Sequence, residues 1–396
     1  MNKPKEILEL EAKLNVSFNR TQNEEDFFES GNRVYSENRF GVCALNLSDL
    51  YLKDISFLSN FPMLNTLNLS ENDIVDISVL SELRGLVNLS LSSNYSLSDI
   101  SPIGDLSSLG SLSLCQCYSL KDLSPLSKLR RMVFLSISSH RTETDFSFIS
   151  NFKFLRSLKI SGCRGELRDI SFLSELTEIE ELDLSHNDIY DVSPIQNMVK
   201  MKTLNLSANK IEDLSAIQNM KNLIFLDISW NKITNIQPLS LLSLKYFDAH
   251  SNQIIDMSPL ENMTSLRHLW IPNNKIESLS FVSKLKNVRK FGVSLNDISD
   301  ASDIEKMSSL SNLSCFNADK VHDAFFIKRL PNIEKVFVDF GCINGSGLLF
   351  YFNEGEIEIS TKEGTMNLDE FSSHIKQKYN LSLDAYCPTL FHLLKE

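Results

Sequence analysis

Leucine and other large apolar residues recur along most of the chain in one pattern, Leu-x-x-Leu-x-Leu-x-x-Asn-x-Ile. The pattern is clearest at residues 64–74 (LNTLNLSENDI), 179–189 (IEELDLSHNDI), 201–211 (MKTLNLSANKI) and 266–276 (LRHLWIPNNKI). Its central alternation of apolar and polar residues predicts a short strand whose apolar side faces inward. One such strand cannot bury its apolar face alone. The repetition therefore predicts stacked turns that share a continuous core.

An asparagine ends most of the strand patterns at a spacing of about 22 residues, and about fourteen turns cover residues 42–340. Its amide can donate to and accept from backbone groups that a bend leaves unpaired. In the three turns between Asn94 and Asn187, the asparagine is replaced by Cys117, His140 and Cys163. Cysteine is small enough to be buried there, whereas His140 predicts an altered bend. The asparagines are Asn72, Asn94, Asn187, Asn209, Asn231, Asn252, Asn274 and Asn296.

The second half of each repeat is also regular, as in DISFLSNF (54–61), DISPIGDL (99–106) and DVSPIQNM (191–198). A Ser-Pro or Ser-Phe step followed by apolar residues predicts a single 3-10 turn. A repeat of about 22 residues is too short for a full helix opposite the strand. We therefore expect an α/β solenoid: a horseshoe with a concave parallel β-sheet, short 3-10 turns on the convex side, and a cap at each end.

The two ends depart from the repeat. Residues 1–41 predict an N-terminal cap that begins with an amphipathic helix over residues 4–14. Residues 341–396 predict a small α+β module, with two strands in 347–361 and a helix in 367–379. A solenoid needs capped ends because its terminal turns expose core. The C-terminal module is interpreted either as such a cap or as a site for partner docking or self-association.

Composition narrows the function classes. The chain has 51 acidic and 39 basic residues and a net charge of −12, which disfavours general binding to nucleic acid. It has no apolar run near the ~20 residues that a membrane span needs, and its start lacks the features of a signal peptide. Seven cysteines, an odd number, favour reduced thiols. We expect a cytoplasmic protein, or one delivered to a host cell without a cleaved signal peptide.

Over about three quarters of its length the chain resembles bacterial leucine-rich-repeat proteins of the internalin type, the subclass with 22-residue repeats. The resemblance implies the solenoid fold. Internalins are typically exported and carry a signal and an attachment region, neither of which is evident here, so their host-adhesion role is not expected. The same repeat class includes intracellular regulators that hold a phosphatase on the concave face.

Large side chains gather on the predicted concave face of the later turns, where the early turns carry small polar residues. Strand periodicity places Phe225, Tyr246 and His268 in one column and Asp227, Asp248 and Trp270 in the next. Aromatic clusters rimmed by charge are typical of protein-binding hot spots. Alternatively, the rings only stack and stiffen the sheet. The predicted partner-binding residues are Phe225, Asp227, Trp230, Tyr246, Asp248, His250, His268, Trp270, Glu181 and Asp183.

Asp227 and Asp248 are expected about 5 Å apart on adjacent strands, where two carboxylates repel each other. Three interpretations stay open. The pair awaits a basic group of a partner, which we favour; it binds a metal together with His250 or His268; or both carboxylates are simply solvated.

The sequence contains no phosphate-binding loop, zinc-protease motif or paired CxxC motif. We therefore expect no enzyme and no cofactor. The predicted function is a non-catalytic scaffold that binds a partner protein across the concave face. The alternative is a binder of small ligands or carbohydrate that uses the same aromatic side chains.

Overall fold

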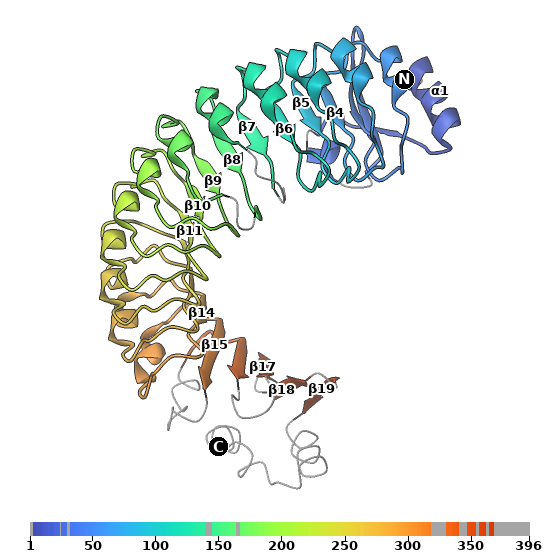
Figure 1. Ribbon diagram of the computed structural model, residues 1–396. Helices are drawn as coiled ribbons and strands as arrows, with labels where there is room; N and C mark the ends of the chain where they lie inside the picture. Colours follow the sequence, from blue (N-terminus) through green and yellow to red (C-terminus); the bar gives the residue numbers. More distant parts are fainter. Residues whose placement is uncertain are drawn as a thin grey trace. The chain divides into compact units, whose positions relative to one another are not determined.

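The computed structural model describes residues 3–23, 25–29, 32–138, 145–163, 167–317, 330–339, 347–353, 356–361 and 364–367. The chain divides into two compact units, residues 1–201 and 202–396. Within each unit, short strands stack side by side in chain order and the 3-10 helices lie on the opposite side of the stack (Figure 1). The position of His140 and residues 368–379 of the helix expected at 367–379 lie outside the described residues, and Asn367 is the last residue of a strand, β19.

The first unit begins with one α-helix and then alternates strands with 3-10 helices. β1 pairs with β2 in parallel, β2 with β3 antiparallel, and β3 to β9 pair in parallel, each with the next. The elements are α1 Lys5–Leu14, β1 Asn19–Arg20, η1 Glu25–Phe27, β2 Val34–Asn38, β3 Gly41–Asn46, η2 Ser56–Asn60, β4 Thr66–Asn68, η3 Ser78–Glu82, β5 Asn88–Ser90, η4 Ser101–Asp105, β6 Ser111–Ser113, η5 Ser124–Lys128, β7 Phe134–Ser136, η6 Ser147–Asn151, β8 Ser157–Lys159, η7 Ser171–Leu173, β9 Glu181–Asp183 and η8 Ser193–Ile195.

The second unit continues the same alternation and ends in an antiparallel segment. β10 to β16 pair in parallel, and β16 to β19 pair antiparallel. The hairpin expected at 347–361 is therefore present as β17 and β18. The elements are β10 Thr203–Asn205, η9 Ser215–Ile217, β11 Phe225–Asp227, η10 Gln237–Leu239, β12 Tyr246–Asp248, η11 Ser258–Leu260, β13 His268–Trp270, η12 Ser280–Lys284, β14 Lys290–Gly292, η13 Ser302–Lys306, β15 Asn312–Asn317, β16 Lys335–Asp339, β17 Gly347–Asn353, β18 Glu356–Thr361 and β19 Gly364–Asn367.

The predicted inward columns form the core. In β11 the middle residue Leu226 and the following Ile228 have no exposed surface, and Phe247 and Phe291 occupy the Leu226 position in later turns. The first and third residues of each three-residue strand, β4 to β14, point to the other side. We call the surface they form the strand face; it corresponds to the concave face expected from the sequence.

The asparagine column bonds successive turns together. The amide of Asn231 donates to the carbonyl oxygens of Leu206 and Ile228 and accepts from the N–H of Ile211. The residue before each such asparagine has a left-handed backbone, as at Ala208 and Trp230. The bend thus turns the chain sharply while its buried polar groups stay paired. Cys117 fills the same position, fully buried, with its thiol 3.3 Å from the carbonyl oxygen of Leu91.

An aspartate starts most of the 3-10 turns, which explains the recurring Asp-x-Ser pattern. Asp99 accepts the backbone N–H of Ser101 at 2.8 Å, and the same bond recurs at Asp122 and Asp256. Hydrogen bonds from Ser101 hold the pKa of Asp99 below its ordinary value. The N-terminal helix is close to expectation: Ile7 and Leu10 are buried, and Pro4 directly precedes the helix.

Candidate binding surface

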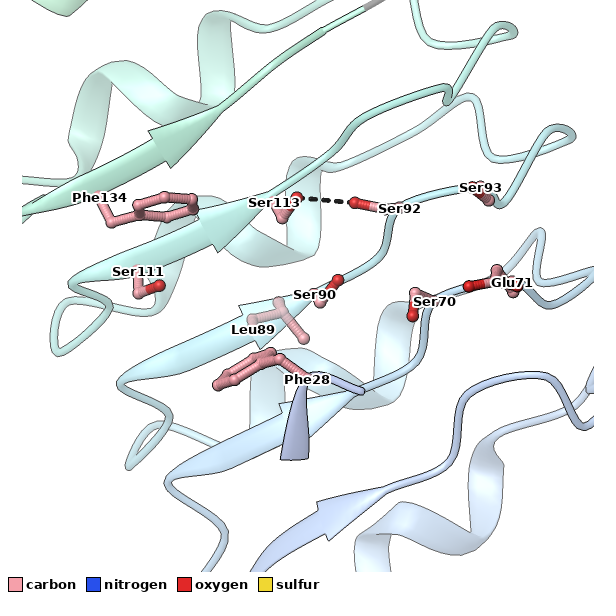
Figure 2. A pocket seen from close by; sticks show the side chains of 10 residues that line it. All are labelled: Phe28, Ser70, Glu71, Leu89, Ser90, Ser92, Ser93, Ser111, Ser113 and Phe134. Carbon is pink, nitrogen blue, oxygen red and sulfur yellow. Dashed lines mark hydrogen bonds between the residues drawn. The ribbon is translucent and has the colours of Figure 1, made fainter. Parts of the chain in front are cut away.

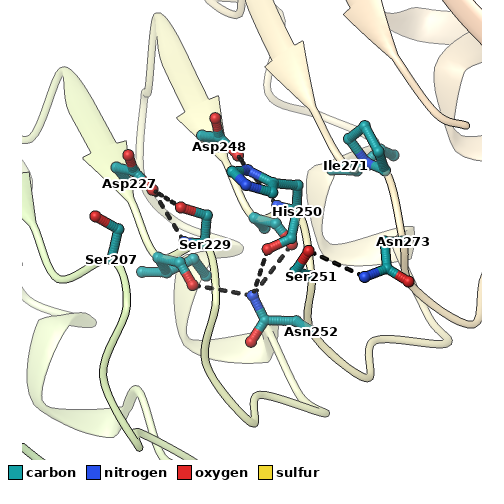
Figure 3. A network of polar contacts seen from close by, with 12 residues as sticks. Ser207, Asp227, Ser229, Asp248, His250, Ser251, Asn252, Ile271 and Asn273 are labelled. Carbon is teal, nitrogen blue, oxygen red and sulfur yellow. Dashed lines mark hydrogen bonds and ion pairs between the residues drawn. The ribbon is translucent and has the colours of Figure 1, made fainter. Parts of the chain in front are cut away.

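Eight of the ten predicted partner-binding residues lie together on the strand face of the second unit, on β11 to β13 and the bends after β11 and β12. The predicted register is confirmed: Phe225 pairs with Tyr246 and Tyr246 with His268, while Asp227 pairs with Asp248 and Asp248 with Trp270. Together with Trp230 and His250, these residues form what we call the aromatic–acidic patch. Figure 3 shows its polar side, where the side chains of Asp227 and Asp248 lie beside those of Ser229 and His250.

The rings of the first column form a continuous stack. The Phe225 and Tyr246 ring centroids are 4.2 Å apart at an interplanar angle of 11°, and those of Tyr246 and His268 are 4.3 Å apart at 25°. Burial, together with the charges of the two aspartates, raises the pKa of Tyr246 to about 12, and burial lowers the pKa of His268. The stack therefore presents uncharged rings at neutral pH.

Trp270 lies over the next strand because that strand carries a glycine. Gly292 is the register partner of Trp270 on β14. A Cβ atom at this position would lie 2.3 Å from Cε3 of the indole, well inside van der Waals contact. The absence of a side chain at Gly292 thus lets the indole lie against the backbone. Sequence reasoning missed this residue, although a glycine following Trp270 in the same column is a readable signal.

Trp230 is the most exposed aromatic residue of the patch, with 61% of its surface accessible. It lies at the bend after β11 in left-handed backbone, with a φ of 54°. Left-handed backbone costs a residue other than glycine roughly 1–2 kcal/mol. Its ring and that of His250 are nearly perpendicular, with a centroid distance of 5.9 Å. Packing does not require a tryptophan here, since Ala208 and Ser251 hold the same position in adjacent turns.

Asp227 and Asp248 each use one carboxylate oxygen to cap their own strand. Oδ1 of Asp227 accepts the N–H and the hydroxyl of Ser229, and Oδ1 of Asp248 accepts the N–H and Nδ1 of His250. Asn205 caps Ser207 in the same way, so an uncharged amide is sufficient for this local bond. The negative charges are additional to what the fold needs.

The two carboxylates differ in their exposure to water. Asp248 is only 7% exposed, which contradicts the interpretation that both are simply solvated. Burial, and secondarily the charge of Asp248, raises the pKa of Asp227. The hydrogen bond to Asp248 raises the pKa of His250. Among the described residues, neither aspartate has an ion pair with a lysine or arginine.

The metal interpretation gains no support from the geometry. In the described part of the chain, no group of three or more histidine, cysteine, aspartate or glutamate side chains could hold a metal ion. A metal site requires several convergent ligands. Nδ1 of His250 is instead occupied by the 2.7 Å contact with Asp248.

Glu181 and Asp183 lie in the first unit, on β9, and are described separately from the patch. Glu181 accepts the hydroxyl of Ser157 at 3.0 Å, and Asp183 caps the N–H of Ser185 at 3.0 Å. Asp183 thus makes the same local bond as the two patch aspartates.

The strand face of the first unit has a pocket of about 440 Å³ that the sequence did not reveal (Figure 2). Phe28, from the N-terminal cap, and Phe134, from β7, are both part of its lining. The segment that carries Phe28 is anchored by Asn46, whose amide donates to the carbonyl oxygens of Asp26 and Glu29. The remaining lining residues are Ser70, Glu71, Leu89, Ser90, Ser92, Ser93, Ser111 and Ser113.

Comparisons with known proteins agree with the architecture. An internalin from Listeria monocytogenes is similar at 33% identity over 66% of this chain and 76% of that one, with a TM-score of 0.60. A leucine-rich-repeat protein from Leptospira interrogans shares the fold, with 19% identity, 86% and 93% coverage and a TM-score of 0.59. No curated protein sequence matched the chain, and none of the described helices is long and apolar enough to cross a membrane. A family model described as a leucine-rich repeat region matches residues 134–333, and the chain belongs to the leucine-rich-repeat family.

Proposed function

We propose that this protein is a non-catalytic scaffold that binds a partner protein on the strand face of its second unit, through the aromatic–acidic patch. One observation carries the proposal: Asp227 and Asp248 lie in register, the first partly buried and the second buried, on a face rich in aromatic side chains. An asparagine would make the same local bonds. Among the described residues His250 is a countercharge for Asp248 only when it is protonated, and a basic group of a partner would supply a permanent one.

The family supports the same class of function, because leucine-rich-repeat proteins generally serve as protein-binding scaffolds. Trp230 and Trp270 add large, partly exposed rings of the kind enriched in binding hot spots. Glu181 and Asp183 are proposed as further contacts for basic groups, on the first unit.

Binding of a small ligand or carbohydrate by the same rings is the weaker candidate. A sugar binds aromatic residues through a free ring face, and both faces of Tyr246 are covered, by Phe225 and His268. The stack also supports the view that these rings stiffen the sheet. Stiffening, however, explains neither the exposed Trp230 nor the two carboxylates.

The test uses an isosteric change of charge. The double variant Asp227→Asn and Asp248→Asn keeps both caps and removes both charges. The control, Asp213→Asn with Asp256→Asn, makes the same change at the caps of Ser215 and Ser258, at the 3-10 helices of the same unit. Proteins captured from source-cell lysate are identified by mass spectrometry and then purified for titration calorimetry.

We expect a partner that binds the wild type and the control alike, and binds the patch variant more weakly by at least about 2 kcal/mol. That is the usual loss when one member of a buried charge pair is removed. A partner that binds all three proteins equally would place the binding site outside the patch.

A further inference from the structure

A row of unpaired basic residues borders the aromatic–acidic patch. Lys245, Arg267 and Arg289 each lie one residue before the start of β12, β13 and β14, and all three side chains are exposed. Lys290, the first residue of β14, lies beside His268 in register. These four residues form the basic edge of the second unit. Among the described residues none of the four has an ion pair.

The basic edge is a ladder of like charges on successive strands. The N–H of Arg267 donates to the carbonyl oxygen of Lys245 at 2.9 Å, and the N–H of Arg289 to that of Arg267 at 2.8 Å. Neighbouring strands lie about 4.8 Å apart, and like charges on directly opposite residues destabilise a sheet. In a chain with a net charge of −12, such a ladder is not required for solubility. An anionic group that binds there would relieve the repulsion among these like charges.

Both signs of charge lie along these strands, the basic residues just before each strand starts and the acidic pair on the strand face. The basic edge lies three residues before the position of Asp227 and Asp248, which corresponds to about 10 Å in an extended strand. A nucleic acid laid across the strands would gain from the basic edge and be repelled by the acidic pair. A protein segment, in contrast, can present carboxylates to one row and a basic side chain to the other.

We infer that the basic edge of Lys245, Arg267, Arg289 and Lys290 binds an acidic segment of the partner protein. This inference rests on the proposed function, because it specifies the charge pattern of the partner that occupies the patch. The segment's acidic residues face the start of the strands, and its basic residue lies toward Asp227 and Asp248. An extended segment with acidic residues at alternate positions, about 7 Å apart, spans the ladder.

A defined probe tests the edge without the partner. A fluorescently labelled oligoglutamate peptide is titrated with the full chain by fluorescence anisotropy, at about 10 mM salt, where the Debye length is about 30 Å. The edge variant carries Lys245→Gln, Arg267→Gln and Arg289→Gln. The matched control carries Lys121→Gln, Arg84→Gln and Arg130→Gln, which are exposed residues of the first unit, so both variants have the same net charge. Thermal unfolding checks that both fold.

We expect the edge variant to bind oligoglutamate about tenfold more weakly than the wild type, because it loses three exposed ion pairs with the peptide. The control should change the affinity less than threefold. Equal affinity in the edge variant and the wild type, or equal losses in both variants, would overturn the inference. If a short oligothymidylate bound more tightly than oligoglutamate, the ligand of the basic edge would be nucleic acid and not an acidic protein segment.

The result is independent of the test of the proposed function. The glutamate side chains of the probe carry no basic group and no aromatic ring, so its binding does not depend on countercharges for Asp227 and Asp248. A negative result at the basic edge therefore refutes only the binding of an acidic segment. The proposed function of the patch is tested separately by the asparagine variants of Asp227 and Asp248.

Discussion

Gly292 is expected to control the position of Trp270, and the variant Gly292→Ala tests this. A Cβ atom at residue 292 would lie 2.3, 2.5 and 2.6 Å from Cε3, Cζ3 and Cδ2 of the indole. Non-bonded carbon atoms pack at about 3.5 Å or more, so the indole has to move by about 1.2 Å. Gly292 does not have a positive φ, so alanine is compatible with the backbone and the change is purely steric.

The magnitude depends on how the ring responds. If the indole stays in place, the overlap costs about 1–3 kcal/mol of stability. Because the indole is partly exposed, we expect it to swing outward instead, with a loss of about 1 kcal/mol or less. A displaced Trp270 no longer contacts a partner in its original position. We therefore expect affinity for the partner to fall by about 2 kcal/mol, as at other binding hot spots.

The chain's two tryptophans make a clean assay possible. In a Trp230→Phe background Trp270 is the only tryptophan, and its emission maximum and acrylamide quenching report its exposure. Gly292→Ala should shift the emission to longer wavelength and increase quenching. Gly110→Ala is the control, since its Cβ would lie 3.4 Å from the nearest atom outside the adjacent residues, the carbonyl oxygen of Arg131. Identical emission and quenching with and without Gly292→Ala would refute the steric argument.

Three further predictions concern stability and protonation. Asp227→Asn should stabilise the fold by up to about 1 kcal/mol at neutral pH, because it removes a carboxylate whose pKa is raised. Chemical denaturation should show that this gain disappears at about pH 3, where the wild-type carboxyl is protonated. Asp248→Asn should lower the pKa of His250 in an NMR titration, because the contact with Asp248 raises this pKa in the wild type. The contact stabilises the fold at pH values below the ordinary histidine pKa, and this stabilisation is lost as the pH rises through the raised pKa of His250. Asn231→Ala should lower the free energy of unfolding in urea by at least about 2 kcal/mol, because it leaves the buried carbonyl oxygens of Leu206 and Ile228 with fewer hydrogen-bond partners. A decrease below about 0.5 kcal/mol would contradict the structural role of the asparagine column.

The fold could be predicted from the sequence because each turn repeats the same local structure. The leucines at fixed spacing identify the core, and Asn231 and its equivalents identify the bends. Once the repeat is aligned, the register of adjacent strands follows from counting residues. The columns of Phe225, Tyr246 and His268, and of Asp227 and Asp248, were therefore predictable, and the strand pairing confirms them.

The features that sequence did not reveal depend on side-chain orientation or on contacts outside the repeat. Counting residues cannot show that His250 turns back onto Asp248, or that the indole of Trp270 lies over Gly292. The pocket beside Phe28 was missed because that residue belongs to the irregular N-terminal segment. Its position depends on the tertiary bonds of Asn46, which no repeat pattern encodes.

Asp227 is the position where structural and binding roles can be separated most sharply. Its cap to Ser229 is a structural role that asparagine performs at Asn205. If capping were its only role, asparagine would serve better, because burial and the neighbouring Asp248 both oppose its charge. A residue whose replacement stabilises the fold but weakens binding carries a stability cost that function explains. A gain in stability at Asp227→Asn with no loss of partner affinity would leave the charge without a function and remove the main argument for the patch.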